Sequence, residues 1–449
     1  MRNFFALITL FCVLAACDKE KEYDKSKAIS AFIAVDPIKL DPALEKVEIK
    51  IPAAQKNNFW SGSAAAQNQR IENFAKDFSE IEKGWFSKKR EISLDKSSFA
   101  WLFYAGNIRD HFVFSPVIKD GKVFILDTSG ALLAKDLASD KKIWSKRIFA
   151  RKILKNYKAP RLGSCQNKLI ATAGVNKVAA VNEADGEIIW SKEISSITIS
   201  NPVCDEKFVY IASNDNKLYA FDLESGELNW VQSGINRSTT IFGAADPVLW
   251  KDFVIVSYSS GEIYGVKKSN GQAMWSQDLN FSKAVNSDFY LNDIDATPFV
   301  KDGMVYAIGN GGLMMAIEVK NGNFLWRKRI AGIVDFWGAG DFLFVINNDD
   351  KLLAISKKTG GIKWISQLPD FKEAKKPETK FIYSGVVMAG GKLVISRSDG
   401  ELLIASPFDG KIEKTISLKK KITHAPVVID DKIYLHSIGK WVIDLIELQ

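Results

Sequence analysis

The chain has 449 residues, a formal net charge of +8, and charged side chains of both signs that make up 25% of the sequence. This small positive charge creates only a weak electrostatic field, and no basic run is interleaved with aromatic residues. Both observations argue against a nucleic-acid partner. The three histidines and four cysteines include no Cys-x-x-Cys pair and no metal-ligand spacing, which argues against a zinc site.

Residues 1–16 predict a cleaved export signal. Arg2 precedes a short apolar core, from Phe4 to Leu14, which is too brief to span a bilayer. Small residues then lead to Cys17 in the run LAAC, which resembles the lipobox of bacterial lipoproteins. Cys17 is therefore the predicted lipidation site, where two or three acyl chains such as palmitate give a firm anchor.

Residues 17–42 are predicted to form a flexible tether, because residues 18–29 are charged and almost without apolar side chains. Asp18 complicates the destination of the anchor. In the enterobacterial sorting rule, an aspartate directly after the lipidated cysteine resembles an inner-membrane retention signal. The inner membrane therefore stays open beside the outer membrane.

One phrase, Ala-x-[Asp/Asn]-x-x-x-Gly-x-x-x-Trp, recurs along the rest of the chain. Its copies end 38 to 51 residues apart, a period typical of propeller blades. A seventh copy ends at Lys414, where the tryptophan is lost. The blade tryptophans are Trp144, Trp190, Trp230, Trp275, Trp326 and Trp364.

Each copy predicts a blade of four antiparallel strands. In the first blade we expect strands at 116–118, 123–126, 131–137 and 143–147. Fourteen residues before the tryptophan stands a residue that tolerates the positive φ of a hairpin turn: Gly130, Asn176, Asn216, Gly261, Gly312, Asp350 and Gly400. We interpret the tryptophans as packing groups between blades, with the alanine or glycine ten residues earlier leaving room for the indole of the adjacent blade.

The count of copies predicts an all-β, eight-bladed propeller. The last blade begins near Ala425 and the sequence ends before its tryptophan position, so that blade lacks an outer strand. Residues 84–89, which carry the unpaired Trp85, are the candidate for that strand and would close the ring. The expected domains are an N-terminal segment over 43–110 and the blades over 111–449.

Cys165 and Cys204 lie at near-equivalent places on the innermost strands of neighbouring blades. An oxidising compartment permits a disulfide between them. Two buried free thiols are the alternative, and the sequence does not choose between the two states.

The repeat resembles that of the quinoprotein-like (PQQ-type) propellers. Together with the lipobox ending at Cys17, the whole chain resembles the BamB family of outer-membrane assembly lipoproteins. That resemblance implies a non-catalytic subunit of the BAM complex, without cofactor, facing the periplasm. It implies binding to the POTRA domains of BamA, association with the other BAM subunits, and contact with unfolded outer-membrane proteins.

The resemblance also implies a docking surface. Its Asp-x-Asp segment matches Asp293 and Asp295 of this sequence, whereas its Leu-Arg-Gly-type loop is poorly matched by residues 234–238. From that loop we carry over Arg237, and Ile235 as the apolar partner. Both segments connect the outer strand of one blade to the inner strand of the next, so they are expected on one face. A plain turn role for these residues is the alternative.

Two other functions share the repeat. A PQQ-dependent periplasmic dehydrogenase would need a quinone sandwiched in the channel, a calcium ion and an aspartate base. The paired cysteines that many such enzymes carry are absent here. A periplasmic scaffold propeller with a different partner is the second alternative.

Overall fold

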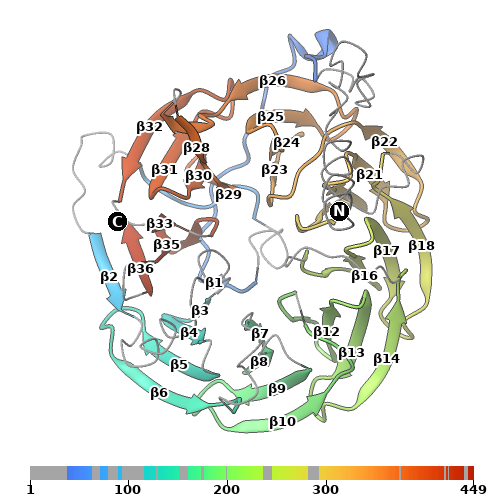
Figure 1. Cartoon of the computed structure of the whole chain (residues 1–449), viewed down its shortest axis with the longest axis vertical. Coiled ribbons are helices and arrows are strands. Elements are labelled where there is room, and N and C mark those ends of the chain that lie inside the picture. Colours follow the sequence, from blue (N-terminus) through green and yellow to red (C-terminus); the bar gives the residue numbers. More distant parts are fainter. Residues whose placement is uncertain are drawn as a thin grey trace, which may run out of the picture. The chain divides into compact units, whose positions relative to one another are not determined.

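The computed structural model shows a closed ring of antiparallel blades (Figure 1). The chain divides after Pro37 into two units, and everything described belongs to the second, Ile38–Gln449. The described residues are 38–62, 71–78, 89–93, 116–127, 130–150, 160–172, 176–198, 200–235, 245–281, 293–373, 376–418, 421–422, 424–438 and 443–448.

The described strands form eight blades, as the repeat predicted. Blade 1 contains β3 (Val117–Lys119), β4 (Lys122–Leu126), β5 (Ala131–Asp136) and β6 (Lys142–Arg147). Blade 2 contains β7 (Arg161–Cys165), β8 (Lys168–Thr172), β9 (Lys177–Asn182) and β10 (Ile188–Glu193). Blade 3 contains β11 (Val203–Cys204), β12 (Phe208–Ser213), β13 (Lys217–Asp222) and β14 (Leu228–Ser233). Blade 4 contains β15 (Val248–Trp250), β16 (Phe253–Ser257), β17 (Glu262–Lys267) and β18 (Ala273–Asp278).

The same order continues around the ring. Blade 5 contains β19 (Phe299–Lys301), β20 (Met304–Ile308), β21 (Met314–Glu318) and β22 (Phe324–Lys328). Blade 6 contains β23 (Trp337–Ala339), β24 (Phe342–Ile346), β25 (Lys351–Ser356) and β26 (Ile362–Gln367). Blade 7 contains β29 (Tyr383–Ala389), β30 (Lys392–Arg397), β31 (Glu401–Ala405) and β32 (Ile412–Ser417). A hairpin of β27 (Phe371–Glu373) and β28 (Lys376–Lys380) lies between blades 6 and 7 in the chain.

The eighth blade joins both ends of the chain. It contains β33 (Lys421–Ile422), β34 (Val427–Ile429), β35 (Lys432–Ile438) and β36 (Ile443–Leu448), and its outer strand is β2 (Lys89–Ser93). Strand β2 pairs with β36 over five residues, from Lys89 opposite Leu448 to Ser93 opposite Asp444 (Figure 1). Closure by an N-terminal strand is thus confirmed, but the strand begins where the predicted segment 84–89 ends. Trp85 lies outside the described residues.

Each described blade tryptophan connects its blade to the next one. The Nε1 group of Trp144 donates to the carbonyl oxygen of Glu183 in blade 2 at 3.1 Å, and that of Trp190 donates to Leu223 in blade 3 at 3.1 Å. The same bond is formed by Trp230, Trp275, Trp326 and Trp364 with the carbonyl oxygens of Lys268, Val319, Lys357 and Pro407. The indole is nearly buried while its single polar group is satisfied.

The space for each indole comes from a different residue than we expected. A Cβ atom on Gly226, four residues before its own tryptophan, would lie 2.5 Å from the Trp190 ring of the preceding blade. The alanine ten residues before the tryptophan instead pairs with the tryptophan of its own blade, as Ala220 does with Trp230. The predicted role of this alanine was therefore wrong. Adjacent strands of one sheet bring the alanine and the tryptophan of the same blade opposite each other. The indole of the preceding blade instead contacts the turn in which Gly226 lies.

The cysteines form a disulfide, Cys165–Cys204, with 5.9 Å between their Cα atoms. Cys165 ends β7 and Cys204 ends β11, so the bond joins the inner strands of blades 2 and 3. This settles the alternative that the sequence left open.

One short helix is described, the 3₁₀ helix η2 (Pro42–Leu44), which lies against blade 6. Asp41 caps it by accepting a hydrogen bond from the backbone N–H of Ala43 at 3.0 Å. The described residues contain no helix long and apolar enough to cross a bilayer.

Candidate docking surface and central channel

The predicted docking residues occupy different environments. Ile235 is 55% exposed, and its backbone carbonyl accepts a hydrogen bond from the Asn216 amide at 2.6 Å. Asn216 lies in the hairpin turn of the same blade, so this bond holds the start of the loop against the blade. Arg237 and Cys17 lie outside the described residues. Ile235 is thus an apolar side chain presented to solvent from a fixed backbone.

The two aspartates among the predicted docking residues, Asp293 and Asp295, are directed inward. Asp293 is 1% exposed and Asp295 is partly buried, so neither presents an open carboxylate surface. Burial, together with the neighbouring carboxylates of Asp293 and Asp335, raises the pKa of Asp295 to about 7. The inward direction of these aspartates could not be predicted, because a connection between blades carries no periodicity that distinguishes its inward from its outward residues.

Asp293 and Asp295 lie beside a series of hydrogen bonds that crosses four blades. The backbone N–H of Asn201 donates to the Asp246 carboxylate at 2.7 Å, and the N–H of Asp246 donates to the Thr297 hydroxyl at 3.3 Å. The N–H of Thr297 then donates to the Asp335 carboxylate at 2.7 Å. Each residue precedes the inner strand of its blade, so the series connects blades 3, 4, 5 and 6 near the ring axis.

Charge is concentrated in this series. Burial and the nearby Asp246 carboxylate together raise the pKa of Asp335 to about 7, against the opposing effect of the Thr297 N–H. Burial also lowers the pKa of Arg161, with Asp246 favouring its charged form. These hydrogen bonds hold the ends of the connections between blades 3 to 6 together. Because they involve buried carboxylates, we expect them to depend on pH.

The N-terminal segment lies along the inner strands of the ring. We call residues 55–62 and 71–78 the central segment. Its strand β1 (Phe59–Trp60) pairs with β3 of blade 1, and its Asn57 side chain donates to the Val428 carbonyl of blade 8 at 3.0 Å. Phe74 donates its N–H to Met388 of blade 7 at 3.0 Å. The central segment therefore lies inside the ring, against the inner strands of blades 1, 7 and 8.

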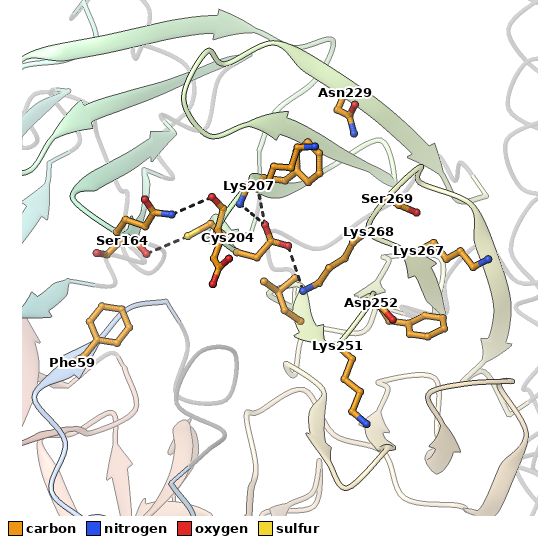
Figure 2. A pocket seen from close by; sticks show the side chains of 16 residues that line it. Phe59, Ser164, Cys204, Lys207, Asn229, Lys251, Asp252, Lys267, Lys268 and Ser269 are labelled. Carbon is orange, nitrogen blue, oxygen red and sulfur yellow. Dashed lines mark hydrogen bonds and ion pairs between the residues drawn. The ribbon is translucent and has the colours of Figure 1, made fainter.

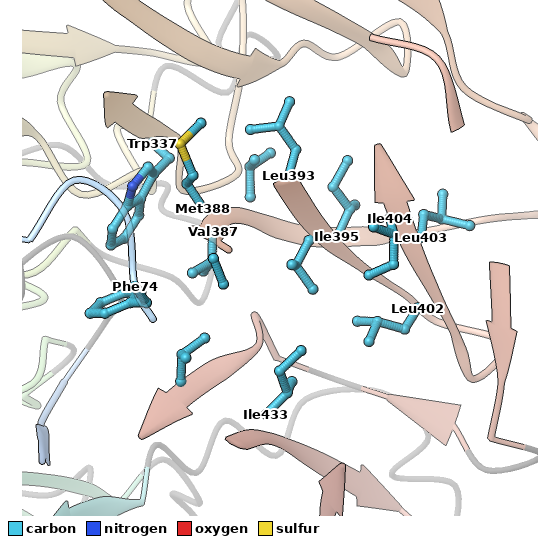
Figure 3. Close-up of a cluster of buried hydrophobic side chains, with 14 of the residues drawn as sticks. Phe74, Trp337, Val387, Met388, Leu393, Ile395, Leu402, Leu403, Ile404 and Ile433 are labelled. Carbon is cyan, nitrogen blue, oxygen red and sulfur yellow. The ribbon is translucent and has the colours of Figure 1, made fainter. Parts of the chain in front are cut away.

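Three aromatic side chains fill this space. The ring of Phe74 lies 5.8 Å from that of Trp60 and 5.4 Å from that of Trp337, and all three are almost completely buried. The Trp337 indole donates to the carbonyl of Glu72 at 2.7 Å. Figure 3 shows Phe74 beside Trp337, on the side of blade 7 where Val387 and Met388 lie. The centre of the ring is thus a packed core here.

An open cavity of about 1270 Å³ lies on the face formed by the turns of blades 2, 3 and 4. Lys268 forms an ion pair with Asp205 at 3.4 Å across it, while Lys251 and Lys267 point away from that pair (Figure 2). The charges of this cavity therefore do not converge on one point. In the part of the chain that the structure describes, no three His, Cys, Asp or Glu side chains gather as metal ligands.

The described blades and the tryptophan contacts between them define the class of the protein, an eight-bladed β-propeller. Within this class the chain resembles outer membrane protein assembly factor BamB, as the sequence predicted. The family model with that description matches residues 154–366. BamB of Shewanella oneidensis is 24% identical over 72% of this chain and 81% of its own length.

Solved structures agree on the fold. The crystal structure of BamB from Moraxella catarrhalis superposes with a TM-score of 0.65 at 17% identity, over 80% of this chain and 98% of that one. Quinohemoprotein alcohol dehydrogenase from Comamonas testosteroni also matches, with a TM-score of 0.61 at 10% identity over 88% of this chain and 81% of that one. Both classes of protein share the propeller, so the fold by itself does not separate a scaffold from an enzyme.

Proposed function

We propose that this chain is a non-catalytic scaffold subunit of the machinery that assembles β-barrel proteins in the outer membrane. It is anchored through Cys17, faces the periplasm, and binds BamA through its POTRA domains. The similarity to BamB proteins along most of the chain carries the proposal. A rigid ring that holds loops at its faces suits a subunit whose work is to bind partners.

The packed centre of the ring supports a scaffold over a dehydrogenase. A quinone sandwiched in the channel would have to displace Phe74 and Trp60, which belong to the same buried core as Trp337. The residues present therefore do not fit that cofactor. If purified protein given the quinone and calcium oxidised alcohols in a dye-linked assay, and chelation abolished that activity, the enzyme would replace the scaffold.

Co-purification from detergent-solubilised membranes tests the proposed partner. Wild-type protein should bring BamA with it from the outer-membrane fraction, and Cys17→Ala should leave the membrane. Absence of BamA from the purified material would overturn the proposal. Recovery in the inner-membrane fraction would assign the alternative destination that Asp18 suggests.

We propose Ile235 and Arg237 as direct contacts, and Asp293 and Asp295 as residues that position the neighbouring loop. Ile235→Asp and Arg237→Glu should each weaken BamA binding by about 1–3 kcal/mol. Ile382→Asp is the matched control, since Ile382 is 65% exposed just before the inner strand of blade 7. Equal loss in the control, or none at Ile235 and Arg237, would remove the patch from the proposal.

A further inference from the structure

The outer strands of the blades carry exposed apolar side chains at a repeated position. They lie one or two residues before the blade tryptophan, and they are between 43 and 55% exposed. The set is Ile143, Ile188, Ile189, Leu228, Met274, Phe324 and Leu325. Blades 2 and 5 each have two adjacent members, and the pair of blade 5, Phe324 and Leu325, is the more exposed at 48 and 55%.

These side chains stand on open strand edges. Strand β22 of blade 5 is the last strand in its sheet and pairs only with β21 among the described strands. Open edges present unpaired backbone groups, and natural proteins usually protect them with charges, irregularities or a covering segment. In β22 the basic residues follow the apolar pair, and Phe324 and Leu325 remain 48 and 55% exposed although Arg327 lies over the Phe324 ring.

Blade 6 shows what covers such an edge. Ile362 stands two residues before Trp364, at the position that Phe324 occupies before Trp326, but it is only 6% exposed. The N-terminal residues 38–45 cover it, and the backbone N–H of Asp41 donates to the Ile362 carbonyl at 2.8 Å.

A basic residue completes the contact on blade 6. The Lys363 ammonium group donates to the backbone carbonyls of Leu44 and Glu45 at 2.9 and 3.0 Å. The covering segment thus combines a backbone hydrogen bond, a buried leucine and carboxylates within eight residues, IKLDPALE.

Blade 5 also carries apolar side chains and cations on its outer strand, although its cations follow the tryptophan whereas Lys363 precedes it, and among the described strands only β21 pairs with β22. Phe324 and Leu325 supply the apolar surface, and Arg327 and Lys328 follow on the same strand as exposed cations. The Arg327 guanidinium lies 5.3 Å from the Phe324 ring, so charge and apolar surface are contiguous.

We propose that β22 is a docking edge for an extended segment of another polypeptide that carries apolar residues and carboxylates. The backbone of the segment binds as that of residues 38–45 binds blade 6, with an N–H on the Phe324 carbonyl, and an apolar side chain packs against Phe324 and Leu325. An acidic group of the segment pairs with Arg327 and Lys328, a contact argued from their charge, since on blade 6 Lys363 binds backbone carbonyls instead. This site goes beyond the proposed function and does not depend on which complex the protein joins.

A fluorescein-labelled peptide with the sequence of residues 38–46, IKLDPALEK, is the probe, and fluorescence anisotropy with the purified full-length protein is the measurement. We expect saturable binding that falls at least tenfold in the double variant Phe324→Glu/Leu325→Glu. Lys142→Glu is the control, because Lys142 is a polar residue at the same position of blade 1. Unchanged thermal midpoints show that both variants remain folded, as expected for exposed side chains.

Two altered peptides test the chemistry. Methylation of the peptide nitrogen at its aspartate removes the backbone donor, and replacement of both acidic residues by lysine reverses the charge. Each change should weaken binding at least fivefold. The proposal is overturned if the double variant binds as tightly as wild type, if neither altered peptide loses affinity, or if wild type shows no binding. The experiment contains no BamA, so its result is independent of the co-purification.

Discussion

The indole nitrogen of Trp230 in blade 3 donates to the backbone carbonyl of Lys268 in blade 4 at 2.8 Å. The contact joins the outer strand of one blade to a turn of the next, and it recurs around the ring. It therefore couples apolar packing with a directed hydrogen bond at each blade junction where a described tryptophan is present.

Two substitutions at Trp230 should separate these contributions. Trp230→Ala removes both and should lower the free energy of unfolding by about 3–5 kcal/mol. Trp230→Phe keeps part of the ring but leaves the Lys268 carbonyl without this donor, with an expected loss of about 1–3 kcal/mol. Guanidinium denaturation followed by circular dichroism measures both. Asn229→Ala, at the exposed neighbour, should change little, and an equal cost for Phe and Ala would contradict the role of packing.

The need for a glycine beneath each indole can be tested by comparing two glycine-to-alanine substitutions. Gly226 and Gly121 have nearly the same backbone φ, +69° and +70°, but only Gly226 lies against a tryptophan. Gly121→Ala should cost about 1–2 kcal/mol for the left-handed backbone alone. Gly226→Ala should cost roughly 1–3 kcal/mol more because its methyl group would overlap Trp190. Thermal unfolding compares the two, and equal midpoints would show that the indole simply moves aside.

The disulfide should stabilise the junction of blades 2 and 3. Cys165 and Cys204 are 39 residues apart, and a loop of this length corresponds to about 3–4 kcal/mol in the chain-entropy account. The double variant Cys165→Ala/Cys204→Ala should unfold at lower denaturant and should not respond to reductant. Wild type should become less stable once reduced. A reductant effect of the same size in the double variant would place its cause elsewhere.

Stability should fall as the pH rises from about 4 to 7. The pKa of both Asp295 and Asp335 is raised to about 7, whereas an unfolded aspartate titrates near 4. Between these values the native state holds protons that the unfolded state has released, so ionisation favours unfolding as the pH increases. Above pH 7 the contribution of both groups levels off.

Asp295→Asn and Asp335→Asn provide the check on this pH dependence. Each should flatten the slope of the unfolding free energy between pH 5 and pH 7, measured by denaturant titration at several pH values. Asp409→Asn is the control, because the pKa of Asp409 is lowered by its hydrogen bonds with Ser406 and Lys411 and it titrates below this window. A slope that neither buried variant changes would assign the effect to other groups.

The repeat predicted the fold because each copy combines several independent constraints. A positive φ is found at Gly130, Asn216 and Asp350, as the expected hairpin turns require. The strands of blade 1 begin and end within two residues of the predicted limits. Tryptophan spacing and turn chemistry point to the same blades, which is why the count of eight was accurate.

The sequence was less informative where the repeat stops. The central segment has no periodicity, so its place along the inner strands could not be predicted from Trp60 or Phe74. The closing strand was placed by aligning Trp85, but pairing is set by the register of β2 on β36, which begins at Lys89. The docking aspartates were placed by resemblance, which fixed their loop and left the inward direction of Asp293 undetermined.

The contact of Asn57 with Val428 spans 371 residues of sequence. This native contact of the N-terminal segment can therefore form only after the C-terminal blade has been synthesised. A ribosome makes Asn57 long before its partner exists, and β2 likewise waits for β36. The early part of the chain therefore cannot complete its native contacts while synthesis continues. Closure of the ring is a late, non-local and slow step, which keeps the growing chain in an open form until its last blade is made.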